Sequence, residues 1–180
     1  EELSVSHGFP LRVIVPGWYA MASVKWLNRI IVSDRPFNGY FQTTDYAFWE
    51  HRDGQPVRVP ISNALVKAEI ARPQMNEVIP QNTTYRIFGA GWVGEANLAR
   101  VEVSTDDGHS WSEARLLGEA IRNAWRLWEF DWQTPSSPQT CKIIARATDD
   151  KGNTQAIKHD PDRGDYMINH CLPMVVKIGN

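Results

Sequence analysis

Short runs of alternating apolar and polar residues recur along the chain, and most of them predict β-strands. In residues 100–104 the side chains of Val101 and Val103 point to one face of a strand and the polar side chains to the other, as in a sheet with one wet face. Residues 141–148 repeat this alternation, with Lys142 and Arg146 on the polar face. The expected strands are residues 11–15, 29–32, 58–61, 85–91, 100–104, 114–117, 124–132, 141–148 and 174–178.

Turn residues separate the later runs at the spacing of a β-sandwich. The pair Asp107-Gly108 follows one alternating run, and Asp149 and Gly152 follow another. Residues of these types favour the tight turns of hairpins. From about Val59 onward we find no convincing amphipathic helix between the runs. The pattern therefore predicts a mainly β fold.

The first part of the chain has a different pattern. Pro10, Pro16 and Pro36 interrupt short apolar pieces there, and roughly fifty residues of this kind cannot easily enclose a core. A polar stretch at residues 51–56 contains the turn signal Asp53-Gly54 and is the best candidate for a boundary. We predict two parts, residues 1–55 and residues 56–180, and expect only the second to be a complete domain.

Composition excludes several classes of protein. The 19 basic residues nearly balance the 21 acidic ones among 180, and this net charge of −2 argues against a nucleic-acid-binding protein. No apolar run approaches the roughly 20 residues that a membrane-spanning helix needs. The two cysteines, Cys141 and Cys171, are not in a CxxC spacing. We expect them to be buried free thiols, with a single disulfide as the alternative.

The densest group of motifs lies near the N-terminus, in His7-Gly8-Phe9-Pro10-Leu11-Arg12, Val15-Pro16-Gly17 and Val24-Lys25-Trp26-Leu27. These segments resemble the HGxPxR, VPG and VKWL pattern of the sulfite oxidase family of molybdenum-cofactor enzymes. Residues 103–111 are similar to that family's S-x-D-G-G-x-x-W hairpin, and residues 124–128 and 145–149 to two strands of its dimerisation domain. The resemblance covers nearly the whole chain and is strongest to bacterial sulfite dehydrogenases.

The resemblance implies a fold and an activity for each part of the chain. Residues 1–55 would be the C-terminal segment of an α+β molybdopterin-binding domain, and residues 56–180 an immunoglobulin-like dimerisation domain. The enzyme would oxidise sulfite to sulfate with a molybdenum cofactor and pass electrons to a cytochrome c or a haem subunit. The family's molybdenum-ligating cysteine belongs to an upstream segment, and neither Cys141 nor Cys171 matches it, so we expect no metal ligand here.

The resemblance also implies partners and a location. We expect the upstream part of the same enzyme, a second copy in a homodimer and a small oxyanion substrate, but no nucleic acid and no membrane span. Sulfite dehydrogenases of this kind are usually exported. We therefore expect a periplasmic enzyme, although the first residues lack the features of a signal peptide.

Three polar residues form the candidate cofactor site. His7, Arg12 and Lys25 lie in apolar, glycine-broken sequence, and donors in such loops suit a phosphate group. The resemblance implies that they contact the pterin and its phosphate. The alternative is that His7 caps a loop, while Arg12 and Lys25 are solvated charges at strand edges.

The resemblance assigns two catalytic residues. Tyr46 matches the tyrosine whose hydroxyl hydrogen-bonds the metal-oxo group and the incoming oxyanion, and a phenol can donate without adding charge at neutral pH. Tyr40 is the competing tyrosine, and a structural role at a domain junction is the alternative for Tyr46. Arg163 matches the substrate-binding arginine. The usual Trp-Asn before it is absent, and three flanking aspartates would partly neutralise it.

Other functions remain open. Sulfane oxidation and eukaryotic-type nitrate reduction are related chemistries on the same scaffold. A β-sandwich can also be a non-catalytic binding or assembly module, with tryptophans as a stacking platform. We expect the rings near predicted strands to fill core or subunit-interface space instead, and these are Trp111, Trp125, Trp128 and Trp132.

Overall fold

The computed structural model describes residues 2–179, which form two compact units. The first unit contains the chain up to Ala64 together with Asp160–Ile168, and the second contains the rest. The boundary expected at residues 55 and 56 falls inside a β-hairpin of the first unit. Asp53 and Gly54 form the turn of this hairpin, with φ angles of 51° and 76°, as in a tight turn between two antiparallel strands.

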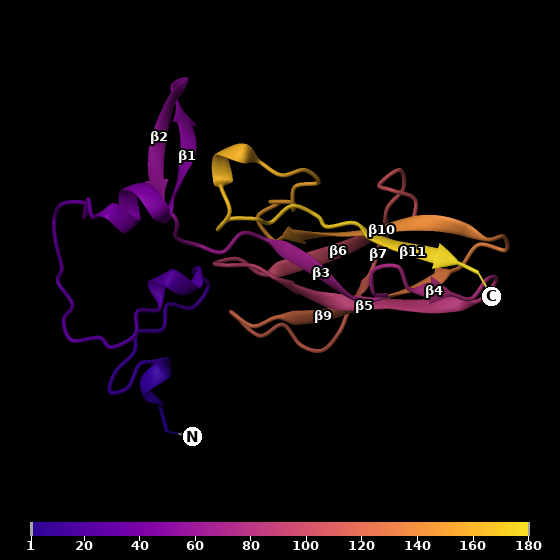
Figure 1. The fold of residues 1–180 in the computed structure, drawn as a ribbon, viewed down its shortest axis with the longest axis horizontal. Helices are drawn as coiled ribbons and strands as arrows, with labels where there is room; N and C mark the ends of the chain where they lie inside the picture. The colour runs from indigo at the N-terminus through magenta and orange to yellow at the C-terminus, as the bar shows by residue number, and fades with distance from the viewer. Residues whose placement is uncertain (1, 180) are drawn as a thin grey trace. The chain divides into compact units, whose positions relative to one another are not determined.

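The second unit is a sandwich of two β-sheets, whose strands except β8 are labelled in Figure 1. One sheet has the order β4 (Val78–Ile79), β11 (Met174–Ile178), β10 (Gln139–Asp149), β6 (Leu98–Ser104) and β7 (Ser112–Glu113), and the other has the order β3 (Lys67–Arg72), β5 (Thr84–Trp92), β9 (Arg126–Gln133) and β8 (Arg115–Leu116). Neighbouring strands are antiparallel except β11 and β4, which are parallel. The expected mainly β fold with a sandwich is confirmed.

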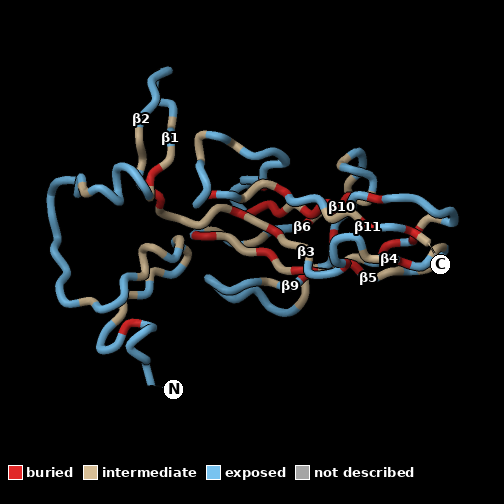
Figure 2. The backbone as a smooth tube through the Cα atoms, in the orientation of Figure 1, coloured by how far each residue is buried: buried red, intermediate tan, exposed pale blue. Residues whose placement is uncertain are grey.

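Every second side chain along these strands points inward, and these inward-facing side chains form the core between the two sheets. On β6, Val101 and Val103 are at most 2% exposed, whereas Arg100 on the same strand faces solvent. The buried positions lie along the strands of the sandwich, as Figure 2 shows. The buried core residues are Val66, Ala68, Ile79, Ile87, Val101, Val103, Ala114, Trp128, Trp132, Cys141, Ile143, Ala145, Ala147, Val176 and Ile178.

The tryptophans divide between core and surface. Trp128 and Trp132 are buried, as expected, and Gly89 makes room for Trp128: a Cβ atom at Gly89 would lie 2.6 Å from that ring. Trp111 is half-buried. Trp125 is 62% exposed and its ring packs at a tilt against that of Trp92, with centroids 4.1 Å apart, so it lies outside the core of this chain.

Both cysteines are buried and unpaired, as expected. Burial raises the pKa of Cys171 to about 11 and also raises the pKa of Cys141. The thiols are therefore protonated at neutral pH and pack as small apolar side chains.

The first unit has little regular structure. Its elements are η1 (Val5–His7), η2 (Ala20–Ala22), the π-helical turn η3 (Phe41–Asp45), the hairpin β1 (Ala47–Arg52) and β2 (Gln55–Pro60), and η4 (Pro161–Arg163). The strands expected at residues 11–15 and 29–32 are wrong, because neither range forms a strand in the described chain. Residues 11–13 share two backbone hydrogen bonds with residues 24–27, which do not extend into a ladder.

Candidate functional site

The backbone of the first unit brings two of the predicted cofactor-binding residues together. Two backbone hydrogen bonds of 2.9 Å join residues 11–13 to residues 24–27, so Arg12 and Lys25 become neighbours. Gly8 lies against both: a Cβ atom there would be 3.2 Å from the Cβ atom of each. Gly8 also has a φ of 116°, a conformation that favours glycine. The close approach therefore depends on the absence of a side chain at this position.

All three predicted donors are tied to the backbone or side chains around η1. Ser4 Oγ lies 2.7 Å from His7 Nδ1, which leaves Nε2 of the ring for another partner. Arg12 Nη1 donates to the His7 carbonyl over 3.3 Å, and Lys25 Nζ donates to the Ser6 carbonyl over 2.8 Å. His7, Arg12 and Lys25 thus form one group, which we call the donor cluster.

The donor cluster has hydrogen-bonding capacity that the described residues do not use. Arg12 Nε is buried and has no hydrogen-bond partner among residues 2–179. A buried N–H without an acceptor is costly, so an acceptor supplied by a ligand would stabilise the site. A guanidinium, an ammonium and an imidazole close together fit a phosphate group. Neither Arg12 nor Lys25 lies in a strand, which disfavours the alternative of strand-edge charges.

Tyr46 lies at the junction between η3 and β1. Its N–H donates to the Phe41 carbonyl over 2.7 Å and closes the turn. Its ring stacks on Phe41, with centroids 5.6 Å apart, and meets the edge of Tyr166 at 4.9 Å and 73°. Arg58 on β2 holds η3 by donating to the Thr43 carbonyl and to the next carbonyl along the chain.

Tyr40 is engaged elsewhere. The nearby Asp45 carboxylate, through hydrogen bonding and through its negative charge, raises the pKa of Tyr40. Within the described part of the chain, no residue accepts a hydrogen bond from the Tyr46 hydroxyl. Its O–H group is therefore available to a substrate. This difference favours Tyr46 over Tyr40 as the hydroxyl that meets a substrate.

Arg163 ends η4 and is held by a neighbouring carboxylate. Asp160 Oδ1 accepts from the N–H of Asp162 over 3.0 Å, and Asp160 Oδ2 accepts from Arg163 Nε over 3.1 Å. The guanidinium lies over the ring of Phe48 on β1, 5.9 Å from its centroid. Asp160 therefore orients Arg163 and also offsets its charge, as the flanking aspartates led us to expect.

The structure places both catalytic candidates in the first unit, although they lie far apart in the sequence. η4 contacts β1, the strand that follows Tyr46. Tyr166, three residues after Arg163, reaches the ring of Tyr46. The catalytic roles of Tyr46 and Arg163 stay predictions.

Sequence reasoning anticipated that Asp160 offsets the charge of Arg163, but not that it caps η4 and orients Arg163, and it missed Tyr166. Asp160 followed by Pro161 is typical of a helix start, and the spacing from Asp160 to Arg163 suits an ion pair, so a local signal was present. Tyr166 had no such signal, because its partner Tyr46 is remote in the sequence and only the tertiary fold brings them together.

Comparison with known families matches both parts of the chain. Residues 1–41 match the family described as the oxidoreductase molybdopterin binding domain, and residues 58–161 match the Mo-co oxidoreductase dimerisation domain. The chain belongs to the sulfite oxidase family of molybdenum-cofactor oxidoreductases. The donor cluster lies inside the first match, whereas Tyr46 and Arg163 lie outside both.

Individual relatives agree with this family. Mitochondrial sulfite oxidase of Mus musculus is 33% identical over 165 residues, covering 86% of this chain and 30% of the relative. An NADH nitrate reductase of Brassica napus is 30% identical over 184 residues, covering 88% of this chain and 20% of the relative. The crystal structure of the sulfane dehydrogenase SoxCD from Paracoccus pantotrophus superposes with a TM-score of 0.79 and 26% identity, covering 96% of this chain and 45% of that one.

The chain thus spans 30% of the length of the mouse and human sulfite oxidases that it matches. None of the helices within residues 2–179 combines the length and the hydropathy needed to cross a membrane. The same residues contain no group of three histidine, cysteine or acidic side chains arranged to hold a metal ion.

Proposed function

We propose that this chain is part of an enzyme that oxidises sulfite to sulfate with a molybdenum cofactor. The observation that carries the proposal is the donor cluster around Gly8, inside the segment that matches the molybdopterin-binding family. The similarity to mouse sulfite oxidase supports the substrate. In the balanced reaction, sulfite and water give sulfate, two protons and two electrons, and a cytochrome c or a haem subunit accepts the electrons.

The donor cluster holds the cofactor. Arg12 and Lys25 would bind the phosphate through charged hydrogen bonds, and the buried Arg12 Nε would gain the acceptor that it lacks among residues 2–179. His7 presents Nε2 to the pterin while Ser4 fixes the other ring nitrogen. When bound, the cofactor supplies oxygen transfer to sulfur and takes up the two electrons.

Tyr46 and Arg163 act on the oxyanion. Tyr46 donates its hydroxyl hydrogen to a substrate oxygen, which stabilises negative charge without adding a positive one. Arg163 attracts the anion with its two Nη atoms while Asp160 holds Nε. These roles require both side chains to keep their orientation, because a misplaced donor loses most of its effect.

We further infer that the enzyme is a homodimer and periplasmic. The match of residues 58–161 to a dimerisation domain supports pairing through the second unit. The periplasmic location rests on the resemblance to exported bacterial sulfite dehydrogenases.

Sulfane oxidation is the second candidate. The structure of SoxCD, a sulfane dehydrogenase, covers 96% of this chain. Asp160 also offsets the charge of Arg163, which favours a substrate less negative than doubly charged sulfite. The donor cluster argues against a purely non-catalytic module, because such a module has no need of a phosphate-binding site.

Metal analysis and a sulfite:cytochrome c assay on the full-length protein test the proposal. We expect stoichiometric molybdenum and sulfite turnover. Molybdenum without sulfite turnover would contradict the substrate and favour a sulfane or nitrate substrate, and absence of molybdenum would contradict the cofactor.

A variant pair tests the donor cluster. Arg12→Gln removes charged hydrogen bonds, so we expect cofactor retention to weaken about tenfold or more. Arg29→Gln changes an exposed arginine in the same part of the chain and should retain cofactor like the wild type. Pterin and molybdenum content after dialysis measures both, and equal retention in the two variants would count against the assigned role of Arg12.

A further inference from the structure

Two aromatic rings hold the ring of Tyr46, and they differ in origin. Phe41 belongs to the same turn, and the backbone hydrogen bond from Tyr46 to Phe41 sets that contact locally. Tyr166 comes from the segment after η4 and approaches with its ring at 73° to that of Tyr46, centroids 4.9 Å apart. This edge-to-face geometry is a favourable arrangement of two aromatic rings. Among the described residues, Tyr166 is the aromatic contact to Tyr46 from outside its own turn.

The contact of Tyr166 is not a by-product of core packing. Tyr166 is 53% exposed, whereas the next residue, Met167, is 4% exposed and anchors the segment. The start of the segment is fixed by Asp160, which caps η4 and pairs with Arg163. Tyr166 thus extends from an anchored loop, and part of its ring contacts Tyr46 while the rest is exposed to solvent.

We propose that Tyr166 is a positioning residue that fixes the ring of Tyr46, and hence the direction of its hydroxyl, for the oxyanion. The inference rests on the proposed function, because it gives that hydroxyl a task. A phenol attached to a turn can rotate about its side-chain bonds, and a partner against the ring limits this rotation. Tyr166 follows Arg163 by three residues. The same loop therefore carries Arg163 and orients Tyr46.

A double-mutant cycle on the full-length enzyme tests the proposal. In Tyr166→Leu we expect kcat for sulfite to fall about tenfold, with KM changed by less than about twofold, because the lost ring contact misaligns a donor without removing a charge. Tyr166→Phe keeps the ring and should restore kcat. Ile168→Ala, an exposed change in the same loop, should behave as the wild type.

The Tyr46→Phe background shows whether the effect passes through the Tyr46 hydroxyl. Without that hydroxyl, misalignment of the ring has nothing left to impair, so we expect Tyr166→Leu to lower kcat no further. An equal loss in both backgrounds, a kcat for Tyr166→Phe as low as for Tyr166→Leu, or a wild-type kcat for Tyr166→Leu would each overturn the proposal.

A spectroscopic readout separates this inference from the proposed function. With 3-fluorotyrosine incorporated, the fluorine resonance assigned to Tyr46 by its loss in Tyr46→Phe should shift in Tyr166→Leu and stay unchanged in Ile168→Ala. A resonance unmoved in Tyr166→Leu overturns the positioning role whatever the activity. Full turnover in Tyr46→Phe instead overturns the catalytic role of Tyr46. The fluorine shift then still shows whether Tyr166 contacts the ring of Tyr46.

Discussion

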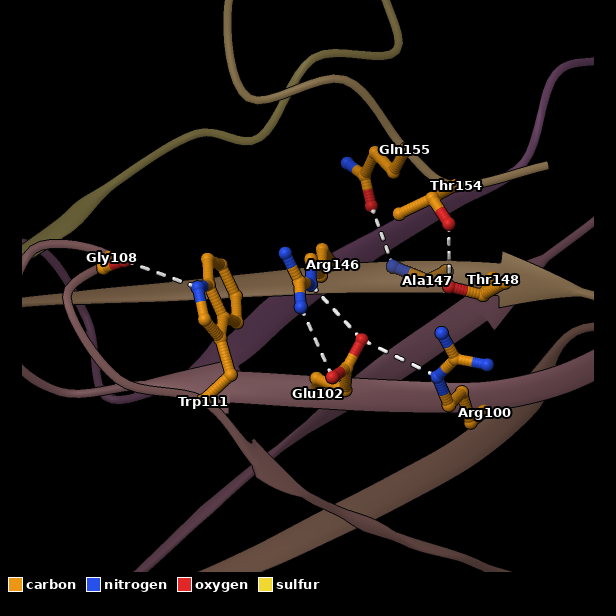
Figure 3. Close-up of polar contacts among 9 residues, drawn as sticks. All are labelled: Arg100, Glu102, Gly108, Trp111, Arg146, Ala147, Thr148, Thr154 and Gln155. Atoms are coloured by element: carbon orange, nitrogen blue, oxygen red, sulfur yellow. Dashed lines mark hydrogen bonds and ion pairs between the residues drawn. The ribbon is translucent and has the colours of Figure 1, made fainter. Parts of the chain in front are cut away.

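At the scale of single residues, Gln155 joins the two sheets of the second unit. Gln155 is 2% exposed, and its Oε1 accepts from the N–H of Ala68 on β3 over 2.8 Å and from that of Ala147 on β10 over 3.1 Å. Figure 3 shows the contact with Ala147. β11 pairs only with Gln139–Ile143 of β10, so Ala147 lies beyond that ladder. One side-chain amide thus accepts hydrogen bonds from backbone N–H groups of a strand in each sheet.

Gln155→Leu should destabilise the second unit. The leucine cannot accept a hydrogen bond, so two buried N–H groups lose their partner, and we expect the free energy of unfolding to fall by about 3 kcal/mol. Urea unfolding, monitored by tryptophan fluorescence, measures this free energy. Gln139→Leu, at an exposed glutamine of β10, should change it by about 0.5 kcal/mol or less. A similar loss in both variants would show that the buried amide has no special role.

At the scale of elements, an ion-pair network covers the outer face of β6 and β10 (Figure 3). Arg146 donates to both carboxylate oxygens of Glu102 over 3.0 and 3.1 Å, and Arg100 lies 3.4 Å from the same carboxylate. The Arg146 guanidinium also lies 4.0 Å from the ring centroid of Trp111, whose Nε1 donates to the Gly108 carbonyl. The network therefore ties two paired strands to the loop between β6 and β7.

Glu102 should make this network sensitive to acid. The hydrogen bond from Arg146, above all, lowers the pKa of Glu102 from its ordinary value of 4.5. The contribution of Glu102 to stability is therefore fully present above pH 4.5 and is lost as the pH falls through the lowered pKa. We expect Glu102→Gln to lower the free energy of unfolding by about 1 kcal/mol at pH 7, and by less at each step below pH 4.5.

Urea unfolding at pH 7 and at several values below 4.5 checks this prediction. Glu119→Gln serves as the control, because Glu119 is an exposed loop residue. A difference between the wild type and Glu102→Gln that stays constant down to low pH would contradict the assigned charge effect.

The sequence could predict the elements that are determined by neighbouring residues, but not those that depend on a distant partner. β6 and β10 were predictable because apolar and polar residues alternate along them, and Val101 and Ile143 are buried as that pattern requires, although Ile144 and Thr148 on the other face of β10 are buried too. The hairpin of β1 and β2 was missed because Asp53-Gly54 was interpreted as a boundary, although the same pair is a hairpin turn. The apolar residues 29–32 were wrongly expected to form a strand, because a strand needs a partner and sequence alternation does not show one.

At the scale of the whole molecule, the two units differ in how much of their apolar surface they bury. The second unit has a continuous core of strand residues. In the first unit the buried apolar side chains of the described residues are Ala47, Ile61 and Met167, while Val32 is 94% exposed. The donor cluster was predictable because its residues lie in a short, dense motif. The contact of Tyr166 with Tyr46 was not, because it depends on how two segments of the first unit that are remote in the sequence come together.

Hydrogen exchange of the chain of residues 1–180 should show this difference directly. Ile30, Ile31 and Val32 are at least 72% exposed, and their segment pairs with no strand among residues 2–179, so opening it requires almost no loss of packing. The amides of β10, in contrast, are bonded to β6 and β11 and exchange only when the sandwich opens. Mass spectrometry should therefore find amides in residues 28–38 exchanging at least about a thousandfold faster than those of β10. Equal protection of the two segments against exchange would mean that the first unit has a folded core of its own. It would contradict the conclusion that the apolar side chains of residues 28–38 are exposed in this chain.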